Sequence, residues 1–193
     1  GDDFNHVVSD NRKGSEMIMN HLFNLGYEKI AIITGPSDIS TGQERLDGYY
    51  SSCVKKGITI DDEFIFQGPF DRNTGYNGAR HFVNLENPPQ AIFAGNDYIA
   101  MGVIDALDEV GLDVPGNIAV VGFDNTDFAA HSRIKLTTVS QRKFDMGALG
   151  VKMLIEIIEQ GKIDYKHKIV LEPRLVIRES CGSKVRGEKI GTR

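Results

Sequence analysis

Short apolar runs alternate with longer amphipathic segments along almost the whole chain. The runs are rich in β-branched residues and predict buried strands. The amphipathic segments carry apolar residues three to four positions apart and often end at a glycine, which is typical of helices. Strands are expected at 29–34, 63–68, 90–95, 117–123, 136–141 and, on both sides of Pro173, in 168–180; helices are expected at 11–26, 41–57, 73–85, 97–111 and 144–161.

This alternation predicts the α/β fold class, with a mostly parallel, doubly wound sheet and helices on both of its faces. Right-handed connections between the parallel strands then follow almost automatically. At 193 residues, the chain has the length of one domain with a substantial core. Neither an internal repeat nor a low-complexity linker interrupts the pattern.

The composition is that of an ordinary globular protein, with 40% hydrophobic and 25% charged residues. No apolar run approaches the ~20 residues of a membrane helix, and the polar first residues do not form a signal peptide. The chain does not begin with methionine and could be a fragment, which weakens the argument from the missing signal. Cys53 and Cys181 are too few for a disulfide framework and predict reduced thiols in a cytoplasmic protein.

The net charge of −5 is unevenly distributed. From Ser183 onward, four basic side chains outweigh one acidic side chain, so this end carries +3 and the rest of the chain carries −8. An acidic body repels phosphate backbones, and we expect no nucleic-acid surface on it. The basic end has the charge to bind polyanions, but a disordered chain end is the favoured interpretation.

Sequence motifs of catalysis and of metal binding are missing. The segment GPSDISTG follows a predicted strand but lacks the Gly-Lys-Ser/Thr ending of a phosphate-binding loop. No strand is followed by G-x-G-x-x-G, and no G-x-S-x-G nucleophile motif occurs. The five histidines are scattered, and there is no Cys-x-x-Cys pair. We therefore expect neither an enzyme nor a cofactor or metal ion.

Polar side chains instead gather where the expected strands end. Because parallel strands end at one edge of a sheet, these side chains are expected to converge there. Carboxylates and amides can pair with vicinal hydroxyls or a heterocycle edge, arginine offers a planar fork of donors, and an aromatic ring can pack on an apolar ring face. This chemistry holds a small polar ligand without transforming it. The candidate residues are Asp10, Arg45, Phe70, Asn96, Asp124 and Gln141.

Several of these residues also have a purely structural interpretation. Asn96 or Asp97 could cap the helix that follows, at least as readily as contact a ligand. Asp124 could serve only the turn after its strand. Arg45 could form an ordinary surface ion pair, and Phe70 could belong to a satellite of the core. The expected convergence on one sheet edge favours a binding site.

Several long segments occur in a characteristic order: VVSDNRKGSEMIMNHLFNLGYEKIAIITGP with ERLDGYYSSCVKKGI, then AIFAGNDYIAMGVIDALDEVGLDVPGNIAVVGFDNTDFAA, then LTTVSQRKFDMGALGVKMLIEII and IVLEPRLVIRES. Together they resemble the effector-binding domain of the lac/galactose repressor family, over about residues 7–180. The resemblance implies a fold like that of the periplasmic sugar-binding proteins, with two Rossmann-like lobes around a ligand cleft. It also implies a transcription regulator that closes the cleft on a small-molecule effector and thereby changes the DNA affinity of an N-terminal helix-turn-helix.

The resemblance implies roles for particular residues. Arg45 is similar to the arginine that grips effector hydroxyls or a base edge. Thr41 is similar to a hydroxyl that contacts the ligand, and Phe70 to an aromatic ring that stacks on it. Asn96 and Asp124 match an amide and a carboxylate of the C-terminal lobe.

Two further matches, Asp10 and Gln141, lie beside the cleft on segments that cross between the lobes. The sequence also departs from the family. Lys135 stands where the family usually has proline, and Arg142 and Lys143 stand where some sugar-responsive members carry an acid and an aromatic residue. The nature of the effector, a sugar or a purine-like metabolite, is therefore left open.

The resemblance also implies a division of the chain. Residues 26–140 and 166–180 would form the C-terminal lobe, residues 1–25 and 141–165 a remnant of the N-terminal lobe, and residues 181–193 a basic tail. About half of the first lobe and the DNA-binding headpiece would then be missing. Such a fragment is expected to bind effector weakly, because it has one complete cleft wall at best, and to bind no operator DNA.

Family members form dimers, so a homodimer is expected. The candidate surface combines the helix that begins at Asp97 with residues 127–134, and its apolar contacts would be Ile99, Val103 and Ile134, although all three could equally pack in the monomer core. A periplasmic sugar-binding receptor of a transporter shares the fold and is the alternative function. A sugar-modifying enzyme has only acidic clusters in its favour. The segments VPGNIAVVGFDN, LTTVSQ and IRES favour the regulator.

Overall fold

The computed structural model describes residues 4–131, 133–160 and 168–184. Its main feature is a six-stranded sheet with the strand order β3-β2-β4-β5-β6-β8. All neighbours in this sheet run parallel except β8, which is antiparallel to β6. A separate parallel pair joins β1 to β7. The strands are β1 His6–Ser9, β2 Ile30–Thr34, β3 Ile65–Gln67, β4 Ala91–Ala94, β5 Ala119–Phe123, β6 Thr137–Ser140, β7 Lys168–Leu171 and β8 Arg174–Val176.

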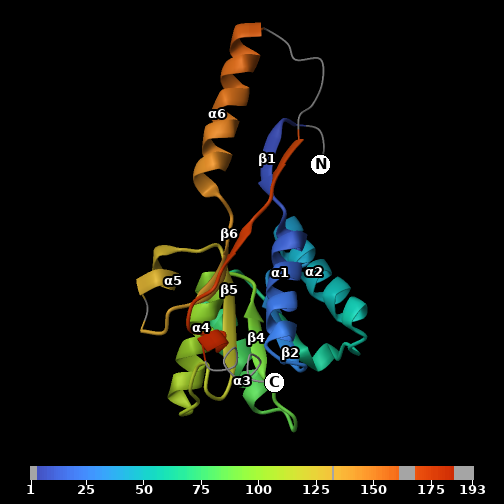
Figure 1. Ribbon diagram of the computed structural model, residues 1–193, viewed down its shortest axis with the longest axis vertical. Helices are drawn as coiled ribbons and strands as arrows, with labels where there is room; N and C mark the ends of the chain where they lie inside the picture. Colours follow the sequence, from blue (N-terminus) through green and yellow to red (C-terminus); the bar gives the residue numbers. More distant parts are fainter. Residues whose placement is uncertain (1–3, 132, 161–167, 185–193) are drawn as a thin grey trace.

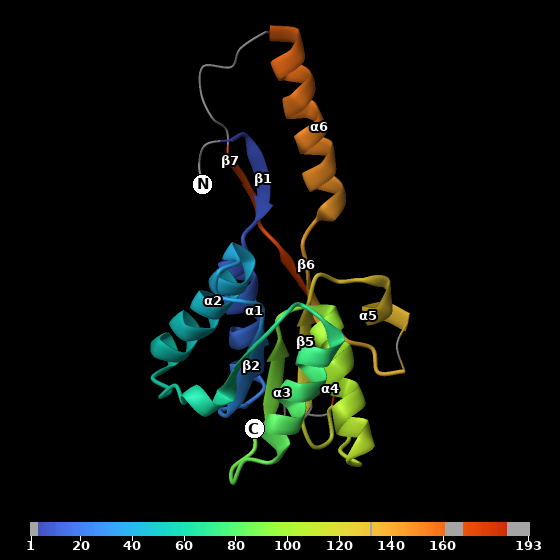
Figure 2. The same ribbon diagram turned by 180° about the vertical axis from the view of Figure 1, so that it is seen from behind.

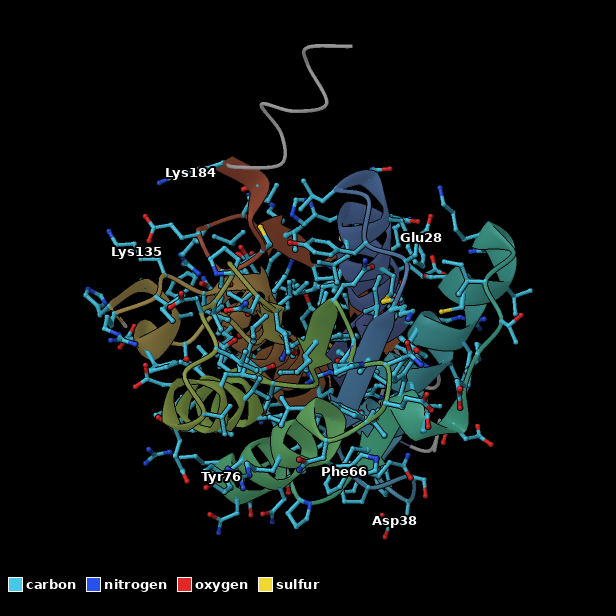
Figure 3. The ribbon with its side chains drawn as sticks, turned by 90° about the horizontal axis from the view of Figure 1, so that it is seen from below. Glu28, Asp38, Phe66, Tyr76, Lys135 and Lys184 are labelled. Atoms are coloured by element: carbon cyan, nitrogen blue, oxygen red, sulfur yellow. The ribbon has the colours of Figure 1, made fainter. Side chains whose placement is uncertain are left out.

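Helices cover both faces of the larger sheet. Helices α1 and α2 pack together on one face, and α3 and α4 pack together on the other. The view from below shows this layering, with α1 and the α3–α4 pair on opposite sides of the strands (Figure 3). The helices are α1 Asn11–Asn24, α2 Ser40–Lys56, α3 Arg72–Val83, α4 Asp97–Glu109, α5 Asp127–His131 and α6 Lys143–Gln160, with a 3₁₀ helix at Asp62–Phe64.

The central strands separate two apolar cores. Successive side chains of a strand point to opposite faces, so Ile30 and Ile32 of β2 enter the core under α1 and α2. Ala31 and Ile33 enter the core under α3 and α4. A strand buried on both faces needs apolar side chains on both, which explains its continuous apolar sequence. The predicted fold class, a doubly wound and mostly parallel sheet, is confirmed.

Helix α1 packs with the larger sheet, which differs from the expected division of the chain. Its residues Ile18, Met19 and Leu22 are completely buried in the core that α1 shares with α2. The expectation had grouped residues 1–25 with 141–165. An amphipathic stripe shows that one helix face is buried but does not show what covers it.

The last expected strand segment also divides differently. Its two halves are separated at Pro173, as predicted, but they join different sheets: β7 pairs with β1, and β8 pairs with β6. Strand β7 therefore leaves the larger unit, in which it was expected. At the other end of the segment, Cys181 is completely buried, so the body of the protein extends into the expected basic tail. Residues 161–167 and 185–193 lie outside the described residues.

Strands β1 and β7 and helix α6 project beyond the carboxyl ends of the parallel strands (Figures 1 and 2). Three segments connect them to the larger sheet, between β1 and α1, between β6 and α6, and between β7 and β8. Helix α6 is only partly packed, and it exposes apolar side chains such as Val151, Leu154 and Ile158. Of the helices described, none combines the length and the apolar character that crossing a bilayer requires.

The segment after β8 forms hydrogen bonds to β5 and β6 of the larger sheet. The Ser180 hydroxyl donates to the carbonyl of Val120 in β5 at 2.5 Å and accepts from the amide of Thr137 in β6 at 2.9 Å. The next residue, Cys181, has its Sγ 3.3 Å from Nε2 of His21 in α1. Burial raises the pKa of the Cys181 thiol, but hydrogen bonds, chiefly the one from His21, outweigh burial and lower the pKa to about 7.

We expect this thiol to make stability depend on pH. A thiol with a lowered pKa in the folded state stabilises the fold above its unfolded pKa of ~8.5, and this contribution is lost as the pH falls through the folded value. The difference in unfolding free energy between wild type and Cys181→Ser should therefore be larger at pH 9 than at pH 6 by roughly 2 kcal/mol. Urea unfolding at both pH values measures it. Cys53→Ser is the control and should show no such increase, because burial raises the pKa of the Cys53 thiol. If Cys181→Ser lowers the unfolding free energy equally at pH 9 and pH 6, the prediction is contradicted.

Two glycines allow the close crossing of α3 and α4. A Cβ atom at Gly102 would lie 1.9 Å from the carbonyl oxygen of Arg72, and one at Gly75 would lie 1.9 Å from that of Ile99. We expect Gly102→Ala to lower the unfolding free energy by about 1–3 kcal/mol or more, because the helix backbones must separate. Gly147→Ala in α6 is the matched control, since its Cβ would meet nothing within 4 Å. The control should be neutral or slightly stabilising in urea unfolding, and an equal loss in both variants would contradict the close crossing.

Candidate functional site

A buried arginine lies at the centre of the polar groups on the carboxyl edge of the sheet. Arg45, in the second turn of α2, is 4% exposed. Its Nε and Nη2 donate to Oδ1 of Asn11 at 3.1 and 3.0 Å. Its Nη1 donates to the carbonyl of Gly95, and Nη2 also donates to Oδ1 of Asp124 at 3.3 Å. Four hydrogen bonds thus occupy a guanidinium that has five N–H groups.

Two aromatic rings enclose the same guanidinium. Its central carbon lies 3.8 Å from the ring centroid of Phe123 and 5.6 Å from that of Phe70. Burial lowers the pKa of Arg45, and the neighbouring Asp124 carboxylate opposes this shift. Arginine stays protonated in proteins, so the pair consists of two opposite charges. Arg45 is therefore a buried ion-pair partner, and not the member of an ordinary surface ion pair that the alternative interpretation described.

Asp124 follows β5 and has a backbone conformation that residues other than glycine rarely adopt. Its φ angle is 103°, and that of Asn125 is 49°. The backbone amide of Asp124 donates to the carbonyl of Val139 at 2.8 Å, and Oδ1 accepts from Arg45 and from Nε2 of Gln141. The hydrogen bonds of the described residues use Oδ1, and the side chain remains 23% exposed. The strained turn thus presents a charged carboxylate with acceptor capacity left at the sheet edge.

A second carboxylate, Asp97, stabilises the strained turn through hydrogen bonds to Thr126 and Thr138. It is 1% exposed, and it accepts from Oγ1 of Thr138 at 2.7 Å and from the amide and hydroxyl of Thr126 at 2.6 and 3.0 Å. Burial raises the pKa of Asp97, and these hydrogen bonds counteract the shift. On the other side of the turn, Nη2 of Arg178 donates to Oδ1 of Asn125 at 2.7 Å. The conformation at Asp124 is therefore fixed by its surroundings.

Asn96 and Phe70 have structural contacts. Oδ1 of Asn96 accepts from the amide of Ile99 at 2.8 Å and caps α4, as its structural interpretation described. Its Nδ2 donates to the carbonyl of Phe70 at 3.3 Å. The half-buried ring of Phe70 packs against Gly35, where a Cβ atom would come within 2.1 Å of it. Both residues stand at the sheet edge beside Arg45, and their contact with a ligand stays a prediction.

The other predicted site residues join the network unequally. Gln141 reaches Asp124 directly. Asp10 caps α1 by accepting from the amide of Lys13 at 2.8 Å, and Thr41 lies half-buried in the first turn of α2. Among the described residues, neither of these two side chains is hydrogen-bonded to Arg45 or Asp124. Arg45, Asp124 and Gln141 are thus brought together, whereas Asp10 and Thr41 only border them.

Sequence reasoning missed Asn11, which supplies the acceptor for two of the Arg45 donors. One signal was available. Asn11 lies on the same helical face as Ser15, Ile18 and Leu22, all of which are buried in the structure. A polar residue on a buried stripe needs a hydrogen-bonding partner.

Two of the three predicted dimer contacts are wrong. Ile99 and Val103 are completely buried in the core under α3 and α4, so neither is exposed to a second subunit. The pattern could not show this, because α4 carries apolar residues beyond its buried face. Ile134 is half-buried and lines a surface hollow between α4 and α5, together with Met101, Ile104 and Phe128. A dimer at this hollow stays a prediction.

The described residues of the site offer hydrogen-bond acceptors to a ligand. The Arg45–Asp124 pair balances its own charge, and the other hydrogen bond to the Asp124 side chain among the described residues comes from the Gln141 amide. Across residues 4–131, 133–160 and 168–184, no three His, Cys, Asp or Glu side chains lie close enough to hold a metal ion. The arrangement suits a neutral molecule with hydroxyl or N–H donors.

Asp97→Asn tests how the strained turn is held. An amide has one acceptor atom and brings an N–H₂ group towards donors that now face a carboxylate. We expect the unfolding free energy to fall by about 1–3 kcal/mol. We also expect the NMR signals of the Asp124 and Asn125 amides to shift. Asp113→Asn, at an exposed position, is the control. Unchanged turn signals in Asp97→Asn would show that other contacts set the conformation.

Comparison with known proteins identifies the family. A sequence model described as a periplasmic binding protein-like domain matches residues 19–181. The HTH-type transcriptional repressor PurR of Proteus mirabilis is 37% identical over 179 residues, which is 92% of this chain and 52% of that protein. The ribose operon repressor of Escherichia coli K12 is 35% identical over 176 residues, which is 91% of this chain and 53% of that protein. The chain thus spans about half the length of these relatives, which are named as repressors and not as enzymes.

Solved structures give the same result. A transcriptional regulator CelR–cellobiose complex aligns with a TM-score of 0.86 and 30% identity, and covers 92% of this chain and 54% of that one. A regulatory protein of the LacI family from Chloroflexus aggregans aligns with a TM-score of 0.86 and 30% identity, and covers 92% of this chain and 64% of that one. The predicted resemblance to the lac/galactose repressor family is confirmed.

Proposed function

The chain belongs to the family of periplasmic binding protein-like domains, and we propose that it is the effector-sensing part of a transcription regulator of the lac/galactose repressor type. The names of the reported relatives and of the aligned structures support a regulator, and none of those reported supports a transporter receptor. In this proposal the protein acts in the cytoplasm, binds its ligand without transforming it, and forms a homodimer. Operator DNA would be bound by a helix-turn-helix headpiece that precedes this domain.

The observation that carries the proposal is the Asp124 carboxylate. It is charged, partly exposed and held in a strained turn at the carboxyl edge of a parallel sheet, where open α/β folds bind their ligands. Arg45 compensates its charge, so the site favours a neutral ligand over an ion. The half-buried ring of Phe70, near Arg45, offers an apolar face for stacking.

These features favour a neutral ring compound that carries several donors. A sugar presents hydroxyl groups to Asp124 and an apolar ring face to Phe70, and a purine base presents N–H groups and a flat face. The aligned CelR structure is a cellobiose complex, and the E. coli relative is a ribose operon repressor. Both names favour a sugar for the present chain.

The proposed mechanism is cleft closure. Asp10 and Gln141 lie on two of the segments that join the larger sheet to the projecting unit of β1, β7 and α6, and Asn11 directly follows the first of these segments. A ligand held by Asp124 and by groups across the cleft stabilises the closed state. The closed state then changes the DNA affinity only as far as the ligand binds it better than the open state.

Asp124→Asn tests the ligand role. We expect the affinity for the responsive probe, D-ribose or cellobiose, to fall about 10- to 100-fold, because a charge-assisted hydrogen bond is lost. NMR titration of the ¹⁵N-labelled chain measures weak binding and shows which residues respond. Asp127→Asn, at an exposed position three residues away, is the matched control and should bind like wild type. Binding that leaves the signals of residues 122–126 unchanged, or equal affinity in Asp124→Asn, would reject Asp124 as the ligand group.

A further inference from the structure

Both polar atoms of the Asn11 side chain form hydrogen bonds within the protein. It is 5% exposed, and its Oδ1 accepts from both Nε and Nη2 of Arg45. Its Nδ2 donates to Oε2 of Glu44 at 2.8 Å and to the carbonyl of Ser9 at 3.3 Å. The start of α1 does not require this amide, because Asp10 supplies the cap. The four hydrogen bonds of Asn11 are therefore not explained by helix capping.

The chemistry of these contacts fixes how the amide is turned. The Glu44 carboxylate accepts hydrogen bonds and cannot face the amide oxygen, so Nδ2 must point to Glu44 and Oδ1 must point to Arg45. Two bonds from one guanidinium edge to one oxygen then set the plane of the Arg45 side chain. That plane directs Nη2 to Asp124 and Nη1 to the carbonyl of Gly95.

We propose that Asn11 is a positioning residue of the effector site, which acts on the Asp124 carboxylate through the Arg45 guanidinium. The hydrogen bonds run from Asn11 to Arg45, from Arg45 to Asp124, and from Asp124 to Gln141. Asn11 is the first residue of α1, directly after the connection from β1, and Gln141 lies in the connection between β6 and α6. The ligand part of this inference rests on the proposed function; the positioning of Asp124 by Asn11 does not.

The first experiment needs no ligand. In the ¹⁵N-labelled 193-residue chain, Asn11→Ala removes the acceptor of the Arg45 Nε–H group. We expect the Arg45 Nε–H signal to move and exchange faster with water. We also expect the amide signals of Asp124 and Gln141 to shift, although both residues are more than 100 positions away in the sequence. Asn20→Ala, an exposed position of the same helix, should move neither.

A compensating pair tests the arrangement if Asn11→Ala folds poorly. The double variant Asn11→Asp with Glu44→Gln exchanges the amide and the carboxylate, so an acceptor again faces Arg45 and a donor again links residues 11 and 44. It should return the Asp124 and Gln141 signals towards their wild-type positions. If both signals stay in place in Asn11→Ala, or if the double variant restores nothing, the positioning role is overturned.

The second experiment measures affinity. For whichever probe, D-ribose or cellobiose, binds the wild type, Asn11→Ala should weaken binding about tenfold and the double variant should restore it. Met19→Ala, a core variant of the same helix that leaves Arg45 untouched, controls for lost stability and should keep its affinity. If neither probe shifts Asp124 in the wild type, the proposed sugar ligand fails, whereas the ligand-free signals still decide the role of Asn11. Equal weakening in Met19→Ala and Asn11→Ala would mean that Asn11 acts only through stability.

Discussion

A guanidinium that is removed from water must find acceptors inside the protein, because an uncompensated buried charge costs several kcal/mol. Arg45 meets this requirement with acceptors from three places in the chain: Asn11 at the start of α1, Gly95 after β4, and Asp124 after β5. The ring of Phe123, at the end of β5, packs against the same guanidinium. These segments must come together for Arg45 to be buried at all. The arginine therefore organises the carboxyl edge of the sheet as much as the sheet positions the arginine.

The strained turn at Asp124 depends on this arrangement. A non-glycine residue at a φ of 103° costs about 1–3 kcal/mol, which the surrounding contacts must offset. Arg45 attracts the carboxylate from one side, and Asp97 holds Thr126 from the other. The result is a fixed carboxylate that no side-chain motion has to bring into place. Such preorganisation reduces the conformational entropy that the protein side chains must lose when a ligand binds.

Much of this architecture could be predicted from the sequence, for a physical reason. Strands buried on both faces must be apolar throughout, so the runs around Ile32 and Val121 identified the central strands and the parallel sheet. Parallel strands end at one edge, which brought Arg45, Asp124 and Gln141 together as predicted. The local pattern could not show what a buried helix face packs against, so α1 was grouped wrongly. It also could not separate the core role of Ile99 from a surface role.

The burial of Arg45 also changes what this residue can do for a ligand. The resemblance implied an arginine that grips the effector, but four of its five N–H groups already bind the protein. In the proposed site, the polar group with the most hydrogen-bonding capacity left for a ligand is therefore the Asp124 carboxylate. A ligand contact made by the larger sheet alone would stabilise the open and closed states equally, and it could not shift the equilibrium between them. In the proposed mechanism, coupling therefore comes from ligand contacts across the cleft, or from a change in the surroundings of Asp124 on closure. The bond from Gln141, on a segment that connects the two units, is a described contact through which closure can reach Asp124.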